Sequence, residues 1–245
     1  EDNMKNLIVD IASLGQIALT RALTSDKFNI LGVTVSPDVA DYEDLAAVNL
    51  EAVRAVSGVP VYKGAQRPLL NNEYVSGKKC VKMETRHEFA KENAVNFILN
   101  RANEYDDLEI ICLGTLSNIA LAILKDEETM SKVKRIYVAG GALLGYTTTT
   151  PTAHHNILAD AEAADTVFKS TIPITLIPAH IAEDASKAAF EVAAGEPAET
   201  MEARVSIDTS IGTTRGQTVI DVVGYNLITM EPNPRKQITV VTALK

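Results

Sequence analysis

Short aliphatic runs alternate along this chain with longer stretches in which apolar residues recur every three or four positions. The runs are typical of buried strands, and the spaced stretches are typical of amphipathic helices. Strands are predicted at residues 7–10, 30–35, 59–62, 109–113, 136–139, 172–177, within 213–221, and at 237–243, where the last strand is expected to close the sheet. Helices are predicted at residues 16–23, 42–56, 88–103, 119–124, 184–194, and after Asp160. This alternation predicts an α/β fold, a single domain over residues 1–245 with a mostly parallel, doubly wound, Rossmann-like sheet.

One stretch, residues 135–168, carries most of the candidate chemistry. Its strand breaks at a Gly-Gly pair, and a threonine-rich loop follows. The polar cluster His154-His155-Asn156 then precedes an alanine-rich helix that Asp160 is placed to cap. Open α/β sheets build their ligand crevices from loops of this kind at the carboxyl ends of strands. A ligand crevice is therefore predicted here.

Composition narrows the class of partner. The formal net charge of the 245 residues is −9, whereas nucleic-acid polymers and anionic membranes require basic patches, so a small neutral ligand is favoured. The chain has only two cysteines, so no disulfide framework is expected, and Cys112 in an apolar run is predicted to be buried. No signal peptide or membrane span is predicted, because Asp10 interrupts the apolar stretch near the N-terminus, and the cytoplasm is the expected location.

Four motifs along the chain resemble one enzyme family. They are Val59-Pro60-Val61-Tyr62-Lys63-Gly64-Ala65, Gly114-Thr115-Leu116-Ser117-Asn118-Ile119-Ala120-Leu121-Ala122, Asn156-Ile157 with Ala159-Asp160-Ala161-Glu162-Ala163-Ala164, and Thr214-Arg215-Gly216-Gln217-Thr218. In this order they resemble motifs of the inosine-uridine-preferring nucleoside hydrolases, and the resemblance covers roughly residues 6–242. It implies the fold of that family, a homo-oligomer, and a small ribonucleoside whose glycosidic bond breaks through an oxocarbenium-like state beside a bound calcium ion.

The calcium motif is where the chain departs from the family. The resemblance implies a calcium ion held by an Asp-x-Asp-x-x-x-Asp-Asp motif and one late aspartate. This sequence keeps Asp10 but has Ala12, Gln16 and Ile17 at the other three positions. Ala12 and Ile17 have no side-chain oxygen, whereas calcium takes about six to eight oxygen ligands, so no cofactor is expected. The remnants of a metal site are Asp10, Asp184 and the backbone of Ser117.

The predicted substrate contacts also rest on the resemblance. Asp38 stands for the asparagine of the family's Ala-Gly-Asn-Val turn, and Thr148 for the asparagine of its Thr-Pro loop. His154 stands for the glutamate of a Glu-x-Asn pair that grips ribose, and Asn156 retains the asparagine of that pair. The segment after His180, which in the family carries helices that wall the base pocket, is much shorter here.

Structural roles compete with several of these functional ones. Asp10 is expected to cap the turn after its strand rather than to act in catalysis, because its partner carboxylates are missing. Asp184 is expected to be the N-cap of the following helix, and Arg215 to hold its own turn. His154 and His155 are neighbours in a predicted strand-like loop, where adjacent side chains point in opposite directions, so joint metal ligation is not expected.

Two hypotheses on function stay open. In the first, favoured by Ala12 and Ile17, the chain keeps the fold without calcium-dependent hydrolysis, and it binds a nucleoside or ribose-like ligand or serves only in assembly. In the second, it is an active ribonucleoside N-ribohydrolase that releases base and ribose with an unusual catalytic base, such as His154 or Asp38, in place of the metal. Asn156 and the threonine-rich loop are either ribose contacts or turn residues. The candidates for catalysis are Asp10, Asp38 and His154.

Overall fold

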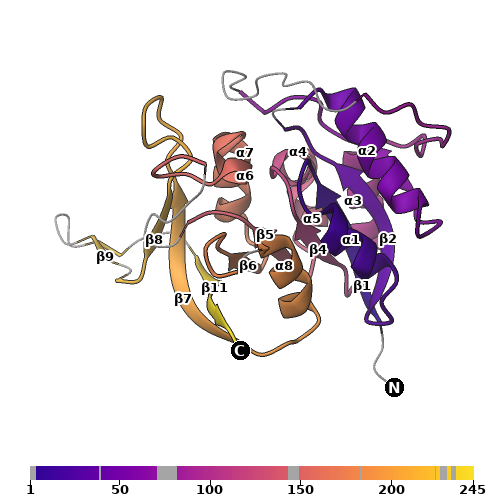
Figure 1. Ribbon diagram of the computed structural model, residues 1–245. Helices are drawn as coiled ribbons and strands as arrows, with labels where there is room; N and C mark the ends of the chain where they lie inside the picture. Colours follow the sequence, from indigo (N-terminus) through magenta and orange to yellow (C-terminus); the bar gives the residue numbers. More distant parts are fainter. Residues whose placement is uncertain are drawn as a thin grey trace.

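A computed structural model describes residues 4–38, 40–70, 82–142, 149–182, 184–223, 225–226, 231–232 and 236–245. Within this part of the chain a nine-stranded sheet has the order β3-β2-β1-β4-β5-β6-β11-β7-β8 (Figure 1). Its strands are β1 (Lys5–Ile11), β2 (Phe28–Val35), β3 (Val61–Lys63), β4 (Glu109–Cys112), β5 (Arg135–Ala139), β6 (Ile174–Ile177), β7 (Ala198–Ile207), β8 (Thr218–Asp221) and β11 (Gln237–Leu244). All neighbours from β3 to β11 are parallel, while β7 is antiparallel to both β11 and β8. A separate antiparallel pair joins β9 (Tyr225–Asn226) to β10 (Glu231–Pro232).

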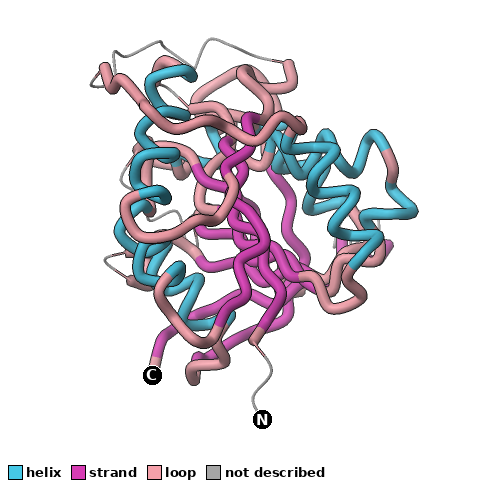
Figure 2. The backbone as a smooth tube through the Cα atoms, turned by 90° about the vertical axis from the view of Figure 1, so that its right-hand side faces the viewer, coloured by secondary structure: helices cyan, strands magenta, loops and turns pink. Residues whose placement is uncertain are grey.

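Helices cover both faces of the sheet, which lies between two helical layers in Figure 2. They are α1 (Gln16–Leu23), α2 (Tyr42–Arg54), α3 (Ala94–Glu104), α4 (Ser117–Lys125), α5 (Glu127–Met130), α6 (His155–Leu158), α7 (Ala161–Lys169) and α8 (Ala185–Ala193). One core packs α3, α4, α5 and α7 against one face, and a second core packs α1, α2 and α8 against the other. Side chains alternate along each strand, so Ile8 enters the first core while Leu7 and Val9 enter the second. The short aliphatic runs of the sequence are therefore strands buried on both faces.

Most predicted elements are confirmed, and three details are corrected. The helix expected from residue 88 begins only at Ala94, because the Asn93 side chain accepts a hydrogen bond from the Val95 N–H and caps it there. The strand at the end of the chain does not close the sheet, since β11 lies between β6 and β7 and β8 forms the edge. The long strand β7 had not been predicted. The surface segment expected at residues 67–84 lies largely outside the described residues.

The connections of the sheet reverse direction between β1 and β4. From β1 the chain proceeds outward through β2 and β3 on one side, and through β4, β5 and β6 on the other. Loops that leave adjacent strands on opposite sides create a crevice at their carboxyl ends. The segments after β1, β2, β4 and β5 contain the predicted site residues Asp38 and Asn156, so the fold brings them to one end of the sheet. Among the described residues, none of the helices is both long and apolar enough to cross a membrane.

Candidate functional site

A cavity of about 660 Å³ lies at the carboxyl ends of β1, β4, β5 and β6. Its volume falls in the range of about 300–1,000 Å³ that is usual for small-molecule sites. Leu14, Gly15, Leu113 and Ala139 form part of its wall. The polar groups in its wall are His154, Asn156, His180, Asp184 and Ser186. This cavity is referred to below as the crevice. Two predicted substrate-binding residues, His154 and Asn156, therefore line it, together with the metal remnant Asp184.

Asp10 lies at the end of β1 and is completely buried. Its Oδ1 accepts hydrogen bonds from Thr34 at 2.5 Å and from the Asn118 amide at 2.7 Å. Its Oδ2 has no hydrogen-bond partner among the described residues. Burial raises the pKa of Asp10 to about 7, against the lowering effect of those two donors. The expected capping role is wrong: Asp10 instead ties β1 to β2 and to the first turn of α4.

The other positions of the predicted metal motif do not face a common point. Ala12 is buried and carries only a methyl group. The Gln16 side chain donates to the backbone carbonyl of Ala12 at 3.1 Å and to the Asn49 Oδ1 at 3.1 Å. Ile17 is 68% exposed on α1. Among the described residues, no group of three or more His, Cys, Asp or Glu side chains is placed to hold a metal ion. The side chains present therefore do not fit a calcium site.

Asp184 acts as the predicted N-cap of α8, and the cap engages one of its two carboxylate oxygens. Its Oδ1 accepts from the backbone N–H groups of Ser186 at 2.9 Å and Lys187 at 3.1 Å. At the same place Gly15, the N-cap of α1, has a φ of 94°, and a Cβ atom there would lie 2.9 Å from the Ser186 Oγ. The left-handed backbone and this close approach both require glycine. The starts of α1 and α8 thus pack directly against each other at the crevice.

Asp38, in the loop after β2, is 2% exposed and bonds to groups on both sides. Its Oδ1 contacts the Nε2 of His155, and its Oδ2 accepts from both the backbone N–H and the hydroxyl of Ser13. The histidine that meets Asp38 is therefore His155, while His154 faces the crevice. Because Ser13 donates to the carboxylate and not to the imidazole, this cluster is not arranged as a nucleophile–base–acid triad.

The two neighbouring histidines occupy a helix start and not the predicted strand-like loop. His154 is the N-cap of α6, and its Nδ1 accepts from the Asn156 N–H at 3.3 Å, whereas His155 is the first helical residue. A Cβ atom on Gly140 would lie 3.0 Å from that Nδ1, so a glycine at the end of β5 leaves room for the ring. Burial, and then the charge of His155, lower the pKa of His154 to about 4. The His154 ring is therefore neutral at pH 7 and can exchange hydrogen bonds with an uncharged ligand.

Asn156 links two strand ends at the floor of the crevice. Its Nδ2 donates to the carbonyls of Leu113 at 3.0 Å and Ala139 at 2.8 Å, which follow β4 and end β5. Both amide hydrogens are used in this way. Its Oδ1 accepts no hydrogen bond within the described part of the chain and belongs to a residue that lines the crevice. Asn156 therefore holds the floor together while keeping an acceptor for a ligand.

Comparisons with known proteins bear on this geometry. The sequence profile of the family described as inosine-uridine preferring nucleoside hydrolase matches residues 9–202. The chain belongs to this family. Uridine nucleosidase 1 of Arabidopsis thaliana is 32% identical over 178 residues, 67% of this chain and 53% of that protein. The pyrimidine-specific ribonucleoside hydrolase RihA of Shewanella sp. strain MR-7 is 34% identical over 173 residues, 65% of this chain and 54% of that protein. The chain spans about half the length of such curated relatives, or somewhat less.

Solved structures carry the same fold. The plant nucleoside hydrolase PpNRh1 matches with a TM-score of 0.83 over 99% of this chain and 95% of that chain, at 18% identity. The purine-preferring ribonucleoside hydrolase of Gardnerella vaginalis matches with a TM-score of 0.78 over 98% and 94%, at 21% identity. At these identities the likeness concerns the fold alone. The predicted nucleoside hydrolase fold is confirmed.

Two nucleoside hydrolase motifs meet at Asn118. Its Nδ2 donates to Asp10 and, at 3.1 Å, to the Val35 carbonyl, while its Oδ1 accepts from the Ala65 N–H at 2.8 Å. A Cβ atom on Gly64 would lie 2.1 Å from that Oδ1, so the glycine of the first motif makes room for the asparagine of the second. Both motifs are visible in the sequence, but the role of Asn118 between them follows only from the fold. The matched positions therefore join segments at the carboxyl ends of β1, β2 and β3.

The remaining family motifs also act on structure. Asp160 caps α7 and accepts a 2.5 Å hydrogen bond from the hydroxyl of Ser117, the first residue of α4. Arg215, 2% exposed, forms a two-pronged ion pair with Glu162 at 2.8 and 2.6 Å. A Cβ on Gly216 would lie 2.7 Å from the Leu158 backbone. The Thr-Arg-Gly turn therefore braces α7 and also α6, which His154 caps and His155 begins. The part in its own turn predicted for Arg215 is the hydrogen bond to the Thr209 carbonyl at 2.9 Å; the contact with Glu162 was not predicted.

Three other predictions can be placed briefly. Thr148, the predicted ribose contact, lies outside the described residues. Cys112 is confirmed as a buried free thiol whose pKa burial raises. Sequence reasoning missed His155 and Ser13 as the partners of Asp38, and no periodic pattern could have found them, because the contact spans 117 positions in one case and 25 in the other. The acidic side chain in the turn after β2 was the only signal.

Proposed function

We propose that this nucleoside hydrolase family member has lost calcium-dependent hydrolysis and binds a ribonucleoside or ribose-like ligand in the crevice. The observation that carries the proposal is the state of the metal motif. Ala12 and Ile17 have no side-chain oxygen to offer, Ile17 is 68% exposed, and the Gln16 amide donates to the Ala12 carbonyl. Asp10 is left as the one carboxylate of the motif.

Calcium chemistry makes this set of donors inadequate. The ion takes about six to eight oxygens, and carboxylates supply most of the balancing charge. Asp10 offers one unpartnered oxygen inside the protein, and its raised pKa, about 7, reduces its negative charge at neutral pH. Asp184 has already given an oxygen to the cap of α8. No step through a metal is therefore derived for this chain.

The crevice still suits a small polar ligand without charge. Its volume is about 660 Å³, and its wall combines apolar residues with the neutral ring of His154 and the free acceptor of Asn156. The curated relatives are named for uridine and for pyrimidine ribonucleosides, which are ligands of this kind. Donors and acceptors on an apolar wall are what orient such ligands in protein sites. A ribonucleoside is thus the ligand class of the proposal.

The proposal is tested by calcium binding. Adding millimolar calcium to the whole chain should move the Tm by no more than about 1 °C, because an ion that does not bind the native state cannot stabilise it. A saturable rise in the Tm would contradict the loss of the metal site.

The triple variant Ala12→Asp, Gln16→Asp, Ile17→Asp tests whether carboxylates alone are missing. We expect that this variant does not bind calcium, since position 17 faces solvent. Calcium binding by the variant would show that these three side chains alone account for the missing metal site.

A second candidate function rests on the contact between Asp38 and His155. A buried carboxylate orients this imidazole, whose side chain is 18% exposed, and such a pair can act as a general base. In that case the chain is an active N-ribohydrolase with an Asp38–His155 base in place of the predicted His154. This function predicts slow ribose release that resists a chelator. The release should fall in both Asp38→Asn and His155→Gln, but not in the control His87→Gln, which changes an exposed residue. Its absence leaves the first proposal standing.

The other expectations accompany this proposal. We take residues 1–245 to be a single nucleoside hydrolase-like domain, and the cytoplasmic location and the homo-oligomer stay predictions. Size-exclusion chromatography with light scattering measures the oligomeric state directly.

A further inference from the structure

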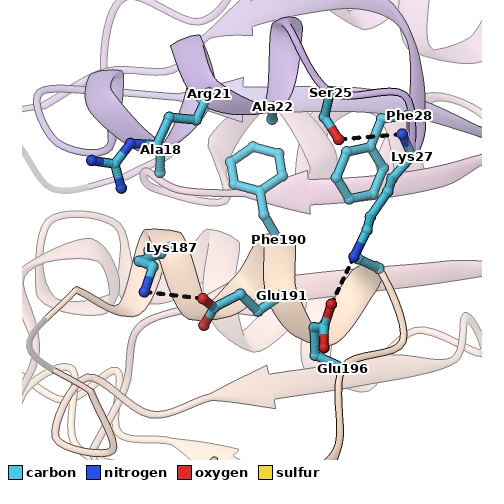
Figure 3. A pocket seen from close by; sticks show the side chains of 11 residues that line it. Ala18, Arg21, Ala22, Ser25, Lys27, Phe28, Lys187, Phe190, Glu191 and Glu196 are labelled. Atoms are coloured by element: carbon cyan, nitrogen blue, oxygen red, sulfur yellow. Dashed lines mark hydrogen bonds and ion pairs between the residues drawn. The ribbon is translucent and has the colours of Figure 1, made fainter.

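A second cavity, of about 310 Å³, lies between α1 and α8, away from the crevice. Ala18 and Ala22 of α1 line it from one side, and Phe190 of α8 from the other (Figure 3). Ala194 also lines it. Phe28, at the start of β2, packs edge-on against Phe190 with the ring centroids 5.8 Å apart and the rings inclined by 60°. Small methyl groups and an aromatic pair, which all belong to the same hydrophobic core, thus give this cavity an apolar wall, and the cavity is called the slot below.

The slot is separate from the crevice because the two helices touch between them. At their crevice ends the space for a Cβ atom on Gly15 is taken by Leu113 and Ser186, both 2.9 Å away. Further along, the alanines of α1 and Phe190 of α8 line the slot. The slot and the crevice thus share both helices but have different walls.

The charges at the rim are unevenly paired. Lys27 pairs with Glu196 at 2.6 Å at one end of the slot, and Lys187 pairs with Glu191 at 3.0 Å at the other (Figure 3). Arg21 also borders the slot and has no ion-pair or hydrogen-bond partner for its side chain among the described residues. Three cations therefore face two carboxylates, so the rim has an excess of one positive charge in a chain whose net charge is −9.

We propose that this slot binds a small aromatic carboxylate, with its rings between Phe190 and the alanines and its carboxylate on Arg21. An arginine fork matches the two oxygens of a carboxylate, whereas both lysines at the rim already have their own carboxylates. Aromatic rings prefer offset-stacked or edge-to-face contacts, so a ligand ring can pack beside the Phe28–Phe190 pair in one of these arrangements. A volume of about 310 Å³ is roughly twice the ~150 Å³ cavity that accepts a benzene ring, so a two-ring acid is the matching size.

The test uses 2-naphthoate and its neutral isostere 2-naphthamide, titrated into the whole chain by calorimetry and by ligand-observed NMR. Naphthoate should bind saturably, one molecule per chain. Naphthamide should bind about fivefold more weakly, which is the upper range for a solvent-exposed ion pair. Arg21→Gln should weaken naphthoate binding to the level of the amide without changing amide binding, while Arg21→Lys should retain part of the difference. Arg86→Gln, at an exposed position outside both cavities, serves as the charge-matched control.

Two filling variants locate the binding. Ala194→Phe should abolish naphthoate binding by filling the slot, and Ala182→Phe, which fills the wall of the crevice instead, should leave it unchanged. The proposal is overturned if neither compound binds saturably at millimolar concentration, or if the acid and the amide bind equally. It is also overturned if Ala182→Phe removes binding and Ala194→Phe does not, which would place the ligand in the crevice. Self-association that Ala194→Phe disrupts would assign the slot to a second copy and likewise overturn it.

Discussion

At the scale of single residues, Asn118 joins three segments at the carboxyl ends of β1, β2 and β3. It is fully buried, donates to Asp10 and to the Val35 carbonyl, and accepts from the Ala65 N–H. The amide side chain of asparagine has an acceptor oxygen and two N–H donors, so it can form hydrogen bonds to three segments at once. The sequence shows only a conventional Ser-Asn turn at this place; the partners come from β1, β2 and the loop after β3.

Replacing Asn118 by alanine is therefore expected to lower the free energy of unfolding by about 3–5 kcal/mol, because it leaves buried polar groups on three segments without partners. Asn100→Ala is the matched control: within the described part of the chain, the side chain of this exposed asparagine of α3 bonds to Glu92 alone, and its loss should cost no more than about 0.5 kcal/mol. Urea unfolding of both variants measures the difference. A loss below about 1 kcal/mol for Asn118→Ala would contradict the role given to it.

His154 predicts a specific dependence of stability on pH. Its folded pKa of about 4 lies below the ordinary value of 6.5, because burial disfavours the charged ring. The stability linked to this neutral ring is fully present above pH 6.5 and is lost as the pH falls through about 4. The difference between these two pKa values corresponds to about 3 kcal/mol in the free energy of unfolding.

The variant His154→Asn keeps an acceptor at the N-cap of α6 but does not titrate. Between pH 6.5 and 4 it should lose about 2–3 kcal/mol less stability than the parent protein, since carboxylate titration is common to both. Chemical unfolding at several pH values provides the comparison. Equal losses in the two proteins would show that the ring is not held neutral by the fold.

At the scale of elements, the close approach after β3 can be tested by glycine substitutions. Gly64 has no special backbone angle, but a Cβ there would lie 2.1 Å from the Asn118 Oδ1, and the whole Asn118 network would have to shift. Gly64→Ala should therefore cost about 1–3 kcal/mol, the usual range for overpacking. Gly58→Ala, where nothing lies within 4 Å of the added atom, should be neutral within about 0.5 kcal/mol. Similar effects at both positions, read from urea midpoints, would refute the steric argument.

The elements also show how far local pattern reaches. The buried strands, α1, and the caps Asp160 and Asp184 were predictable, because aliphatic runs, helical spacing and capping residues are local signals. The start of α3 was predictable in principle from Asn93, an ordinary N-cap residue. β7 carries a strand signal in the alternation of Met201, Ala203, Val205 and Ile207, which polar neighbours obscure.

The candidate site was less predictable than the fold, for a physical reason. His154 and His155 differ in role because α6 begins between them, and a four-residue helix has no periodicity to reveal it. The contact of His155 with Asp38 depends on the order of strands in the sheet and on the bracing of α6 by Gly216. Family motifs identified the scaffold reliably, since most of the matched residues hold loops together, but the pairing of site residues follows from tertiary packing.

At the scale of the whole molecule, the chain keeps the scaffold of the family, but its side chains do not provide the family's metal motif. The motifs around Asn118, Asp160 and Arg215 still hold the strand ends in place, and the crevice of about 660 Å³ persists. The motif after β1 retains only Asp10, whose carboxylate now serves as an anchor between strands. This combination is what supports the proposal that the chain binds a nucleoside without hydrolysing it.

The most direct test is ribose release from uridine and inosine, measured over hours at high protein concentration, with calcium and with a chelator. The account predicts no release in either condition, together with saturable binding of a nucleoside to the same preparation. Release that the chelator abolishes would contradict the account, because it would require a calcium site built from side chains that the chain does not bring together. Release that persists in chelator would transfer the function to Asp38 and His155.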